Sequence, residues 1–236
     1  MDFLPKTTSS EEAARAASVA VLPVGSFEQH GHILPLATDT MVACVIAEHV
    51  AARYELFLLP PIAYGCSHEH AGFAGTVSIS AATLYRVVED IRTSLEQQGI
   101  RKLVLVNGHG GNYVLGNVVQ EANVSEPRMA LFPQRDDWEQ ARKSAGMVTS
   151  NHEDMHGGEL EVSLLLATAP ELVRDINPSD DHISSDRTHI HVRGMSGYTD
   201  SGIIGRPSLG DATKGKLALE ELADVFERHL NLLTGQ

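Results

Sequence analysis

Short apolar runs and stretches of helical periodicity alternate along the chain. Apolar runs predict buried strands at residues 19–24, 56–59, 103–106 and 129–132. Apolar positions at helical spacing predict helices at residues 40–53, 81–98, 112–122, 136–145, 159–167 and 212–233. Strands that alternate with helices are typical of an α/β fold with a mainly parallel central sheet between helical layers. No linker or internal repeat interrupts the pattern, so we expect a single domain over residues 1–236.

Three stretches fall outside this alternation. Residues 1–17 are expected to form an N-terminal arm, with a short helix capped near Ser10 and ending by Ala17. Residues 64–78 are rich in Gly and His and too irregular for scaffold, and long structured loops more often carry function than packing. Residues 175–210 are rich in Asp, Ser, His, Gly and Pro, and we expect a long loop that covers the functional site.

Composition and charge exclude several classes of protein. The chain is 42% hydrophobic and 21% charged, which is ordinary for a soluble globular protein, and its formal charge of −13 argues against broad binding to nucleic acid or an anionic membrane. Cys44 and Cys66 have no zinc-knuckle spacing and are expected to be free thiols. The first 17 residues lack the features of a signal peptide and no run is long enough to span a membrane, so we expect a cytoplasmic protein.

Ligand-type side chains follow two of the predicted strands. Glu28 and His30 come just after the first strand, and residues two apart on an extended chain point the same way. Asp39 returns from the connecting loop, where its two oxygens can bridge two metal ions. His109 follows the third strand, in the string NGHGGN. The carboxyl ends of parallel strands are where ligands usually bind, and nitrogen and oxygen donors suit a divalent metal, so the sequence predicts a metal site there.

A further cluster opens the helix predicted at residues 159–167. His156 and Glu159 are three residues apart and can share a helix face, whereas Glu159 and Glu161 are two apart and cannot. Glu159 is therefore our candidate for the remaining carboxylate, the alternative being a simple partner of the helix dipole. Three carboxylates supply about −3 against about +4 from two divalent ions, and a bridging hydroxide would make the site neutral. Such donors suit Zn²⁺, Mn²⁺, Fe²⁺ or Co²⁺.

Four strings in this chain resemble motifs of the creatininase (creatinine amidohydrolase) family. They are LPVGSFEQHGHILPLATD at 22–39, EHAGFAGTVS at 69–78, NGHGGN at 107–112 and HGGELEVS at 156–163. The resemblance covers about residues 19–175 in the family's order. It implies a three-layer α/β/α sandwich, two divalent metal ions per subunit, and hydrolysis of an amide-type C–N bond. It also implies a homo-oligomer, with a hexamer favoured.

The resemblance also implies roles for individual residues. One metal would be held by Glu28, Asp39 and His109, and the other by His30, Asp39 and Glu159, with Asp39 bridging. His156 matches the family's catalytic histidine, which assists proton transfer to the leaving nitrogen. Glu159 is expected to be a catalytic residue together with His156, in addition to being a metal ligand.

The chain departs from creatininase itself at Gly111. Creatininase has NGHYEN, with a glutamate ligand where this chain has Gly111, so the missing carboxylate is expected to come from Glu159. NGHGGN instead resembles other branches of the family, a peptidase of mycofactocin biosynthesis and a deformylase of formylamino-pyrimidines. The substrate-binding candidates come from the loops around the predicted metal site. They are Glu69, His70, Thr76, Gly110, Gly111 and Trp138.

The function expected from these residues is hydrolysis of a non-standard amide, such as a cyclic amide or formamide, by water that paired metals activate. Two alternatives remain open. One is a metallopeptidase that trims a short peptide precursor, and the other is a non-catalytic protein that binds a metal or metabolite. Ser26 is discounted as a nucleophile because no GxSxG turn surrounds it.

Overall fold

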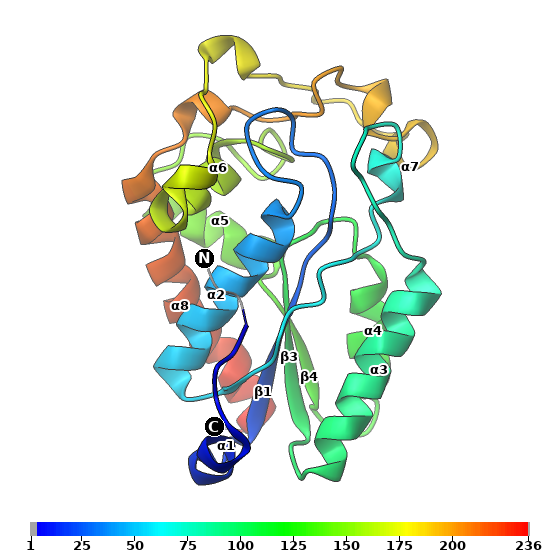
Figure 1. Cartoon of the computed structure of the whole chain (residues 1–236), viewed down its shortest axis with the longest axis vertical. Coiled ribbons are helices and arrows are strands. Elements are labelled where there is room, and N and C mark those ends of the chain that lie inside the picture. Colours follow the sequence, from blue (N-terminus) through cyan, green and yellow to red (C-terminus); the bar gives the residue numbers. More distant parts are fainter. Residues whose placement is uncertain (1–3, 236) are drawn as a thin grey trace.

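A computed structural model describes residues 4–235 and places a four-stranded parallel sheet at the centre of the molecule (Figure 1). The strands are β1 (Val19–Val24), β2 (Phe57–Leu58), β3 (Lys102–Asn107) and β4 (Met129–Phe132). Their order is β2-β1-β3-β4, and every neighbouring pair is parallel. From β1 the chain continues to one edge of the sheet, and from β3 to the other. The carboxyl ends of β1 and β3 therefore flank a topological switch point, where α/β proteins bind their ligands.

Helices cover both faces of this sheet (Figure 1). The longer helices are α2 (Thr38–Tyr54), α3 (Ala81–Gln97), α4 (Val114–Ala122), α5 (Arg135–Ser144), α6 (Glu159–Thr168) and α8 (Ala212–Thr234). Helix α2 packs on β1 and β3, and α8 packs on α2, α5 and α6 to complete that layer. Helices α3 and α4 pack on each other over the opposite face.

The alternation of side chains along each strand builds two separate cores. Val21 of β1 and Val104 of β3 are buried in the core beneath α2 and α8. Their neighbours Leu22 and Leu105 are buried in the core beneath α3 and α4. Because successive side chains of a strand point to opposite faces, strands covered on both sides appear in the sequence as continuous apolar runs. The predicted three-layer α/β/α sandwich is confirmed.

The predicted elements are confirmed with small shifts of their ends. The second strand is shorter than predicted, since only Phe57 and Leu58 pair with β1. The short N-terminal helix, α1 (Ser9–Arg15), is capped by Thr8 rather than near Ser10, because the Thr8 side chain accepts the Glu11 N–H and the Glu11 side chain bonds back to the Thr8 N–H. Residues 1–3 of the predicted arm lie outside the described residues.

The segment predicted as a loop at residues 175–210 contains short helical turns and crosses the carboxyl end of the sheet (Figure 1). The turns are η3 (Pro178–Asp180), α7 (Ile190–Arg193), η4 (Met195–Gly197) and η5 (Pro207–Leu209), and two further turns lie elsewhere, η1 (His68–His70) and η2 (Pro170–Leu172). Ile204 exchanges two backbone hydrogen bonds of 2.9 Å with His156, which fixes this segment over the start of α6. No helix among residues 4–235 has the length and apolar content of a membrane span.

Candidate metal centre and active site

The turn after β1 lies against the start of α2, so the two ends of the loop that connects these elements are close together. An ideal Cβ on Gly25 would lie 2.3 Å from the Cα of Thr40, so only glycine lets the start of α2 approach the end of β1 this closely. The Thr40 hydroxyl donates to the Ser26 carbonyl at 3.1 Å, which fixes the contact. As a result, Asp39, on the first turn of α2, faces the loop that carries Glu28.

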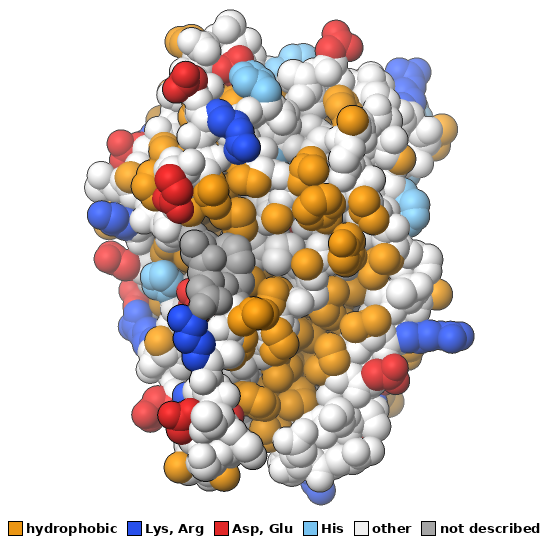
Figure 2. All heavy atoms as spheres, in the orientation of Figure 1, with side chains coloured by type: hydrophobic (Ala, Val, Ile, Leu, Met, Phe, Trp, Pro, Cys, Tyr) orange, Lys and Arg blue, Asp and Glu red, His pale blue; other side chains and the backbone are white. Residues whose placement is uncertain are grey.

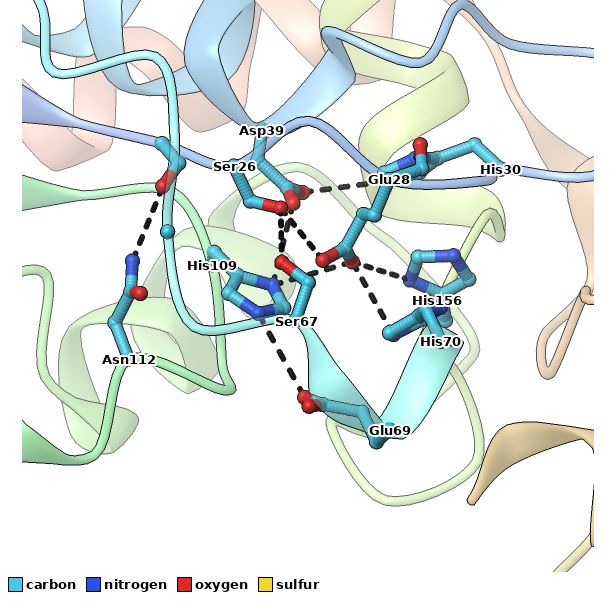
Figure 3. A network of polar contacts seen from close by, with 12 residues as sticks. Ser26, Glu28, His30, Asp39, Ser67, Glu69, His70, His109, Asn112 and His156 are labelled. Carbon is cyan, nitrogen blue, oxygen red and sulfur yellow. Dashed lines mark hydrogen bonds and ion pairs between the residues drawn. The ribbon is translucent and has the colours of Figure 1, made fainter. Parts of the chain in front are cut away.

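Glu28, Asp39 and His109 form the first group of metal-ligand type. Nδ1 of His109 lies 3.2 Å from Oε1 of Glu28 and 3.2 Å from Oδ2 of Asp39 (Figure 3). All three residues are buried. Donor atoms about 2.1 Å from one divalent ion are separated by roughly 3 to 3.5 Å, so this triangle has the dimensions of a coordination face. The structure thus brings together the three predicted ligands, which follow β1, open α2 and follow β3.

A second group shares Asp39. Nε2 of His30 lies 3.2 Å from Oδ1 of Asp39 and 3.6 Å from Oε1 of Glu161. In each group the candidate donor atoms all lie within 4.8 Å of one another. Asp39 therefore directs one oxygen to each group, as a carboxylate bridging two cations would.

Glu159 does not lie in this cluster, which corrects the sequence-based choice of ligand. Its carboxylate is turned toward α8, where it accepts from Lys214 Nζ at 2.6 Å and from the hydroxyl of Thr149 at 2.6 Å. It also accepts the backbone N–H groups of Val148 and Thr149. Burial raises the pKa of Glu159, but these hydrogen bonds and the Lys214 charge outweigh it and hold the pKa below its usual value. The residue is a buried structural anion, without contact to the ligand groups.

Glu161 takes the place that was assigned to Glu159. Helix α6 begins at Glu159, so Glu161 lies in its first turn and reaches back over the helix start, where its Oε2 accepts the Gly157 N–H at 2.6 Å. This turns Oε1 toward His30. The sequence contained the signal, since both glutamates stand in HGGELE. The choice between them depends on which one faces β1 and which one faces α8.

The buried oxygens in the centre of the cluster fit a cation. Oε1 of Glu28 and Oδ2 of Asp39 are buried and accept no hydrogen bond within residues 4–235. Buried carboxylate oxygens in that condition are costly unless a positive charge lies beside them. The donor set of carboxylate and imidazole matches a divalent transition metal. The buried cluster therefore indicates divalent metal binding.

The two imidazoles are held in the tautomers that a metal requires. Nδ1 of His30 lies 3.1 Å from the Glu28 carbonyl, and Nε2 of His109 lies 3.1 Å from the Cys66 carbonyl. A carbonyl only accepts, so each of these nitrogens carries the hydrogen. In the neutral ring the other nitrogen, which faces the cluster, then keeps its lone pair. Such outer hydrogen bonds orient metal-binding histidines in many proteins.

In the absence of a bound cation, the carboxylates of the cluster favour protonation of His30 and His109. Burial lowers the pKa of His109, but the carboxylates of Glu28 and Asp39 outweigh it and raise that pKa well above its ordinary value. Burial likewise opposes protonation of His30, and Asp39 and Glu161 again raise the pKa. Burial raises the pKa of Asp39, while the two histidines pull it well below the usual range. A bound cation replaces these protons, so metal binding releases protons.

Two more histidines adjoin the cluster. His156 donates from Nε2 to the Gln29 carbonyl at 2.6 Å, and its Nδ1 lies 3.7 Å from Oε1 of Glu28. His70 places Nε2 3.2 Å from the same oxygen (Figure 3). Burial, with His30 nearby, lowers the pKa of His156, and burial, with His156 nearby, lowers the pKa of His70. His156 thus lies beside the ligand groups, and its catalytic role stays a prediction.

A cavity of about 660 Å³ opens onto both ligand groups. Of the substrate-binding candidates, five line it, namely Glu69, His70, Gly110, Gly111 and Trp138. Thr76 is not among its lining residues; its hydroxyl accepts the Gln29 N–H at 3.2 Å, and its contact with substrate stays a prediction. Ser26 is held as a donor to Oε2 of Glu28 at 2.6 Å, in agreement with its dismissal as a nucleophile.

Comparison with known proteins identifies the family of this chain. The family model described as creatinine amidohydrolase matches residues 6–230. The chain belongs to the creatininase family. It is 34% identical to the mycofactocin precursor peptide peptidase of Mycobacterium ulcerans, over 94% of this chain and 87% of that protein. It is 31% identical to the creatinine amidohydrolase of Pseudomonas putida, over 76% of each chain. The manganese form of creatininase superposes with a TM-score of 0.73 and 27% identity, covering 96% of both chains.

In this creatininase-family chain, the side chain of another residue fills the space beside Gly111. An ideal Cβ there would lie 2.1 Å from Oε1 of Glu69 and 2.4 Å from Nε2 of His109. The Glu69 carboxylate thus occupies the room that a side chain at position 111 would need, 3.6 Å from Nε2 of His109. The carboxylate beside Gly111 is therefore that of Glu69, while the carboxylate expected from Glu159 is supplied to the second ligand group by Glu161.

Proposed function

We propose that this chain is a metal-dependent hydrolase that cleaves an amide C–N bond other than an ordinary peptide bond. It would use two divalent ions, Zn²⁺, Mn²⁺ or Fe²⁺, per subunit. The observation that carries the proposal is the shared carboxylate of Asp39, which directs one oxygen to each of two buried ligand groups. Relatives named for hydrolysis of creatinine and of a peptide precursor support the reaction class.

The ligand sets follow from the two groups. Glu28, Asp39 and His109 would hold one ion, and His30, Asp39 and Glu161 the other. Bound there, divalent ions lower the pKa of water and polarise a carbonyl. The buried Ser26 hydroxyl donates to Oε2 of Glu28 at 2.6 Å and holds this carboxylate in place, so it needs little reorganisation during the reaction.

His156 is the proton carrier in this proposal. Its neutral ring is held by the Gln29 carbonyl, which leaves the lone pair of Nδ1 facing the cluster and the cavity. At that atom it accepts a proton from the attacking water and returns it to the leaving nitrogen.

The test is a hydrolysis screen of the metal-depleted protein reloaded with Mn²⁺, Zn²⁺ or Fe²⁺. Formamides, cyclic ureides and short acetylated peptides are offered, and amine release is measured. We expect activity that depends on added metal and saturates near two ions per chain. Asp90→Asn, at an exposed position on α3, is the matched control for Asp39→Asn. Metal-loaded protein that binds two ions and hydrolyses none of these compounds would favour the non-catalytic alternative.

Peptide trimming is the second candidate, and one observation favours it over a small cyclic amide. The cavity over the cluster adjoins a second cavity of about 450 Å³, and Glu69, Gly111 and Tyr113 line both. A small metabolite needs only the first of these spaces. The curated relatives at 31–34% identity over more than nine-tenths of this chain are named as peptidases of a precursor peptide.

We also propose that the chain assembles as a homo-oligomer, with a hexamer favoured, in the cytoplasm. Hydrophobic side chains gather along one face, over the segment that follows β2 (Figure 2). In the loops after β2, Tyr64 and Val77 are each 49% exposed, and contiguous apolar surface of this kind often marks an interface. Light scattering after gel filtration tests it, with Val77→Glu expected to lower the assembled mass. The buried free thiols of Cys44 and Cys66 are consistent with a reducing compartment.

A further inference from the structure

A second cavity of about 450 Å³ adjoins the catalytic one and shares three lining residues with it. We call it the Gly111 chamber; it is bounded by η1 on one side and by α7 and η4 on the other. Glu69, Gly111 and Tyr113 line both spaces, so the two cavities meet where the NGHGGN loop passes the cluster. Figure 3 shows Glu69 on that side of His109, beyond the ligand groups.

The junction depends on two glycines. Gly110 lines the catalytic cavity, and a Cβ built on it would meet nothing within 4 Å. Gly111 lines both cavities, and the Glu69 side chain fills the space next to it. Any larger side chain at position 110 would extend into the catalytic cavity beside this junction. Gly110 therefore leaves open space on the side of the catalytic cavity, whereas the space beside Gly111 is taken by Glu69, whose side chain lies at the boundary between the two cavities.

The outer wall of the chamber carries one arginine, in a chain whose formal charge is −13, and the inner end carries the carboxylate of Glu69. Arg193 lines it, and no carboxylate within residues 4–235 comes within 4.0 Å of its guanidinium. The pKa of Asp186 is lowered mainly by hydrogen bonds from Thr188, and the charge of Arg193 contributes to this lowering from a greater distance. His191 lies beside it along α7, with its ring 5.3 Å from that of Tyr113 across the chamber. The Glu69 carboxylate lies at the inner end, with its Oε1 3.6 Å from Nε2 of His109.

We propose that the Gly111 chamber binds the carboxylate-bearing end of an extended, peptide-like amide, with Arg193 as the residue that pairs with the carboxylate. This proposal rests on the proposed hydrolysis at the metal cluster. Ligand pockets for drug-sized molecules hold about 300–1,000 Å³, so each of the two cavities has room for its own part of such a substrate. Guanidinium is well suited to a carboxylate because it donates two parallel hydrogen bonds.

The experiment compares acetylated peptides of two to six residues in two matched series. One series has a free C-terminal carboxylate and the other a C-terminal carboxamide; N-succinyl peptide amides carry the charge at the opposite end. With the metal-loaded full chain we expect a preference of about tenfold in kcat/KM for a carboxylate over its uncharged counterpart, expressed mainly in KM. The preference should appear only once the peptide is long enough to reach the chamber.

Two variants test the assignment. Arg193→Gln should remove the preference for the carboxylate, and Arg86→Gln, exposed on α3 and outside both cavities, should retain it. Ala71→Trp should abolish the gain with peptide length, because Ala71 lines the chamber, is exposed and has a helical backbone that accepts any residue. Calorimetric titration of the same peptides gives the affinities independently of turnover.

The outcomes separate this proposal from the proposed function. If peptides are hydrolysed without regard to length or terminal charge, or if Arg193→Gln retains the preference, the chamber has been misassigned while the hydrolase stands. If the loaded protein hydrolyses no amide, the hydrolase fails, and titration still decides about the chamber. Equal affinity for the carboxylate and carboxamide peptides would overturn the chamber in that case as well.

Discussion

Asp39 and His109 come from segments seventy residues apart in the chain, yet Oδ2 of Asp39 lies 3.2 Å from Nδ1 of His109. The other oxygen of the same carboxylate lies 3.2 Å from Nε2 of His30. One short side chain at the start of α2 thus connects imidazoles that follow two different strands. Neither ligand group is complete without it.

Substitution of Asp39 is therefore expected to empty both sites. Asp39→Asn preserves shape but removes the charge and one acceptor, so metal content measured by mass spectrometry should fall from about two ions per chain toward zero. Turnover should fall by at least about a thousandfold, the equivalent of several kcal/mol in the barrier. The exposed Asp90→Asn is the control. Full metal content in Asp39→Asn would contradict the shared-ligand assignment.

The two glutamates of α6 are expected to behave oppositely. Glu161→Gln should bind about one ion per chain and lose most activity, because only the group with His30 is broken. Glu159→Gln should keep both ions but lose stability, because its new amide N–H₂ would face donors from Val148, Thr149 or Lys214. The cost is about 1–3 kcal/mol, seen as a drop in Tm of roughly 2–10 °C. The reverse pattern would restore Glu159 as the ligand.

Replacement of His156 should separate catalysis from metal binding. His156→Asn leaves all five proposed ligand residues in place, so metal content should be unchanged. Turnover should fall by about two to four decades, the usual contribution of a positioned acid–base group. The matched variant is His152→Asn, an exposed histidine near the same segment. A normal rate in His156→Asn would exclude it as the proton carrier.

Removal of metal should produce a stability maximum near pH 6.5. In the metal-free chain the raised pKa values of His30 and His109 contribute stability below their unfolded value of 6.5 that is lost as the pH rises through the folded values. The lowered pKa values of His70 and His156 act oppositely, so stability is lost as the pH falls below 6.5.

Bound metal should abolish the alkaline limb of that profile, because His30 and His109 are then neutral ligands and have no protons to lose. Thermal unfolding between pH 5.5 and 8.5, with chelator or with Zn²⁺, measures both curves. A chelated protein whose Tm rises steadily from pH 6.5 to 8.5 would show that the four histidines do not carry the assigned pKa shifts.

The sequence by itself determined the layered fold and four of the proposed ligands. Continuous apolar runs of four to six residues that end at Gly, Pro or Asn favour strands buried on both faces, and helical spacing between them makes a parallel sheet the consistent arrangement. Glu28, His30 and His109 follow strands whose ends must share one edge. Asp39 stands at the start of the next helix, so its distance from them is limited by a short loop. These relations are local in sequence or follow from topology.

Only the tertiary structure decided between Glu159 and Glu161, the role of Glu69 and the existence of the Gly111 chamber. Which glutamate faces the cluster depends on the phase of α6 and on Lys214, fifty-five residues beyond Glu159, which captures one of the two. Glu69 fills the space at Gly111 because η1 packs against a loop from a different strand. The chamber depends on α7, in a segment with no periodicity to predict it. Each outcome is set by contacts between segments distant in sequence, and residue spacing carries no information about them.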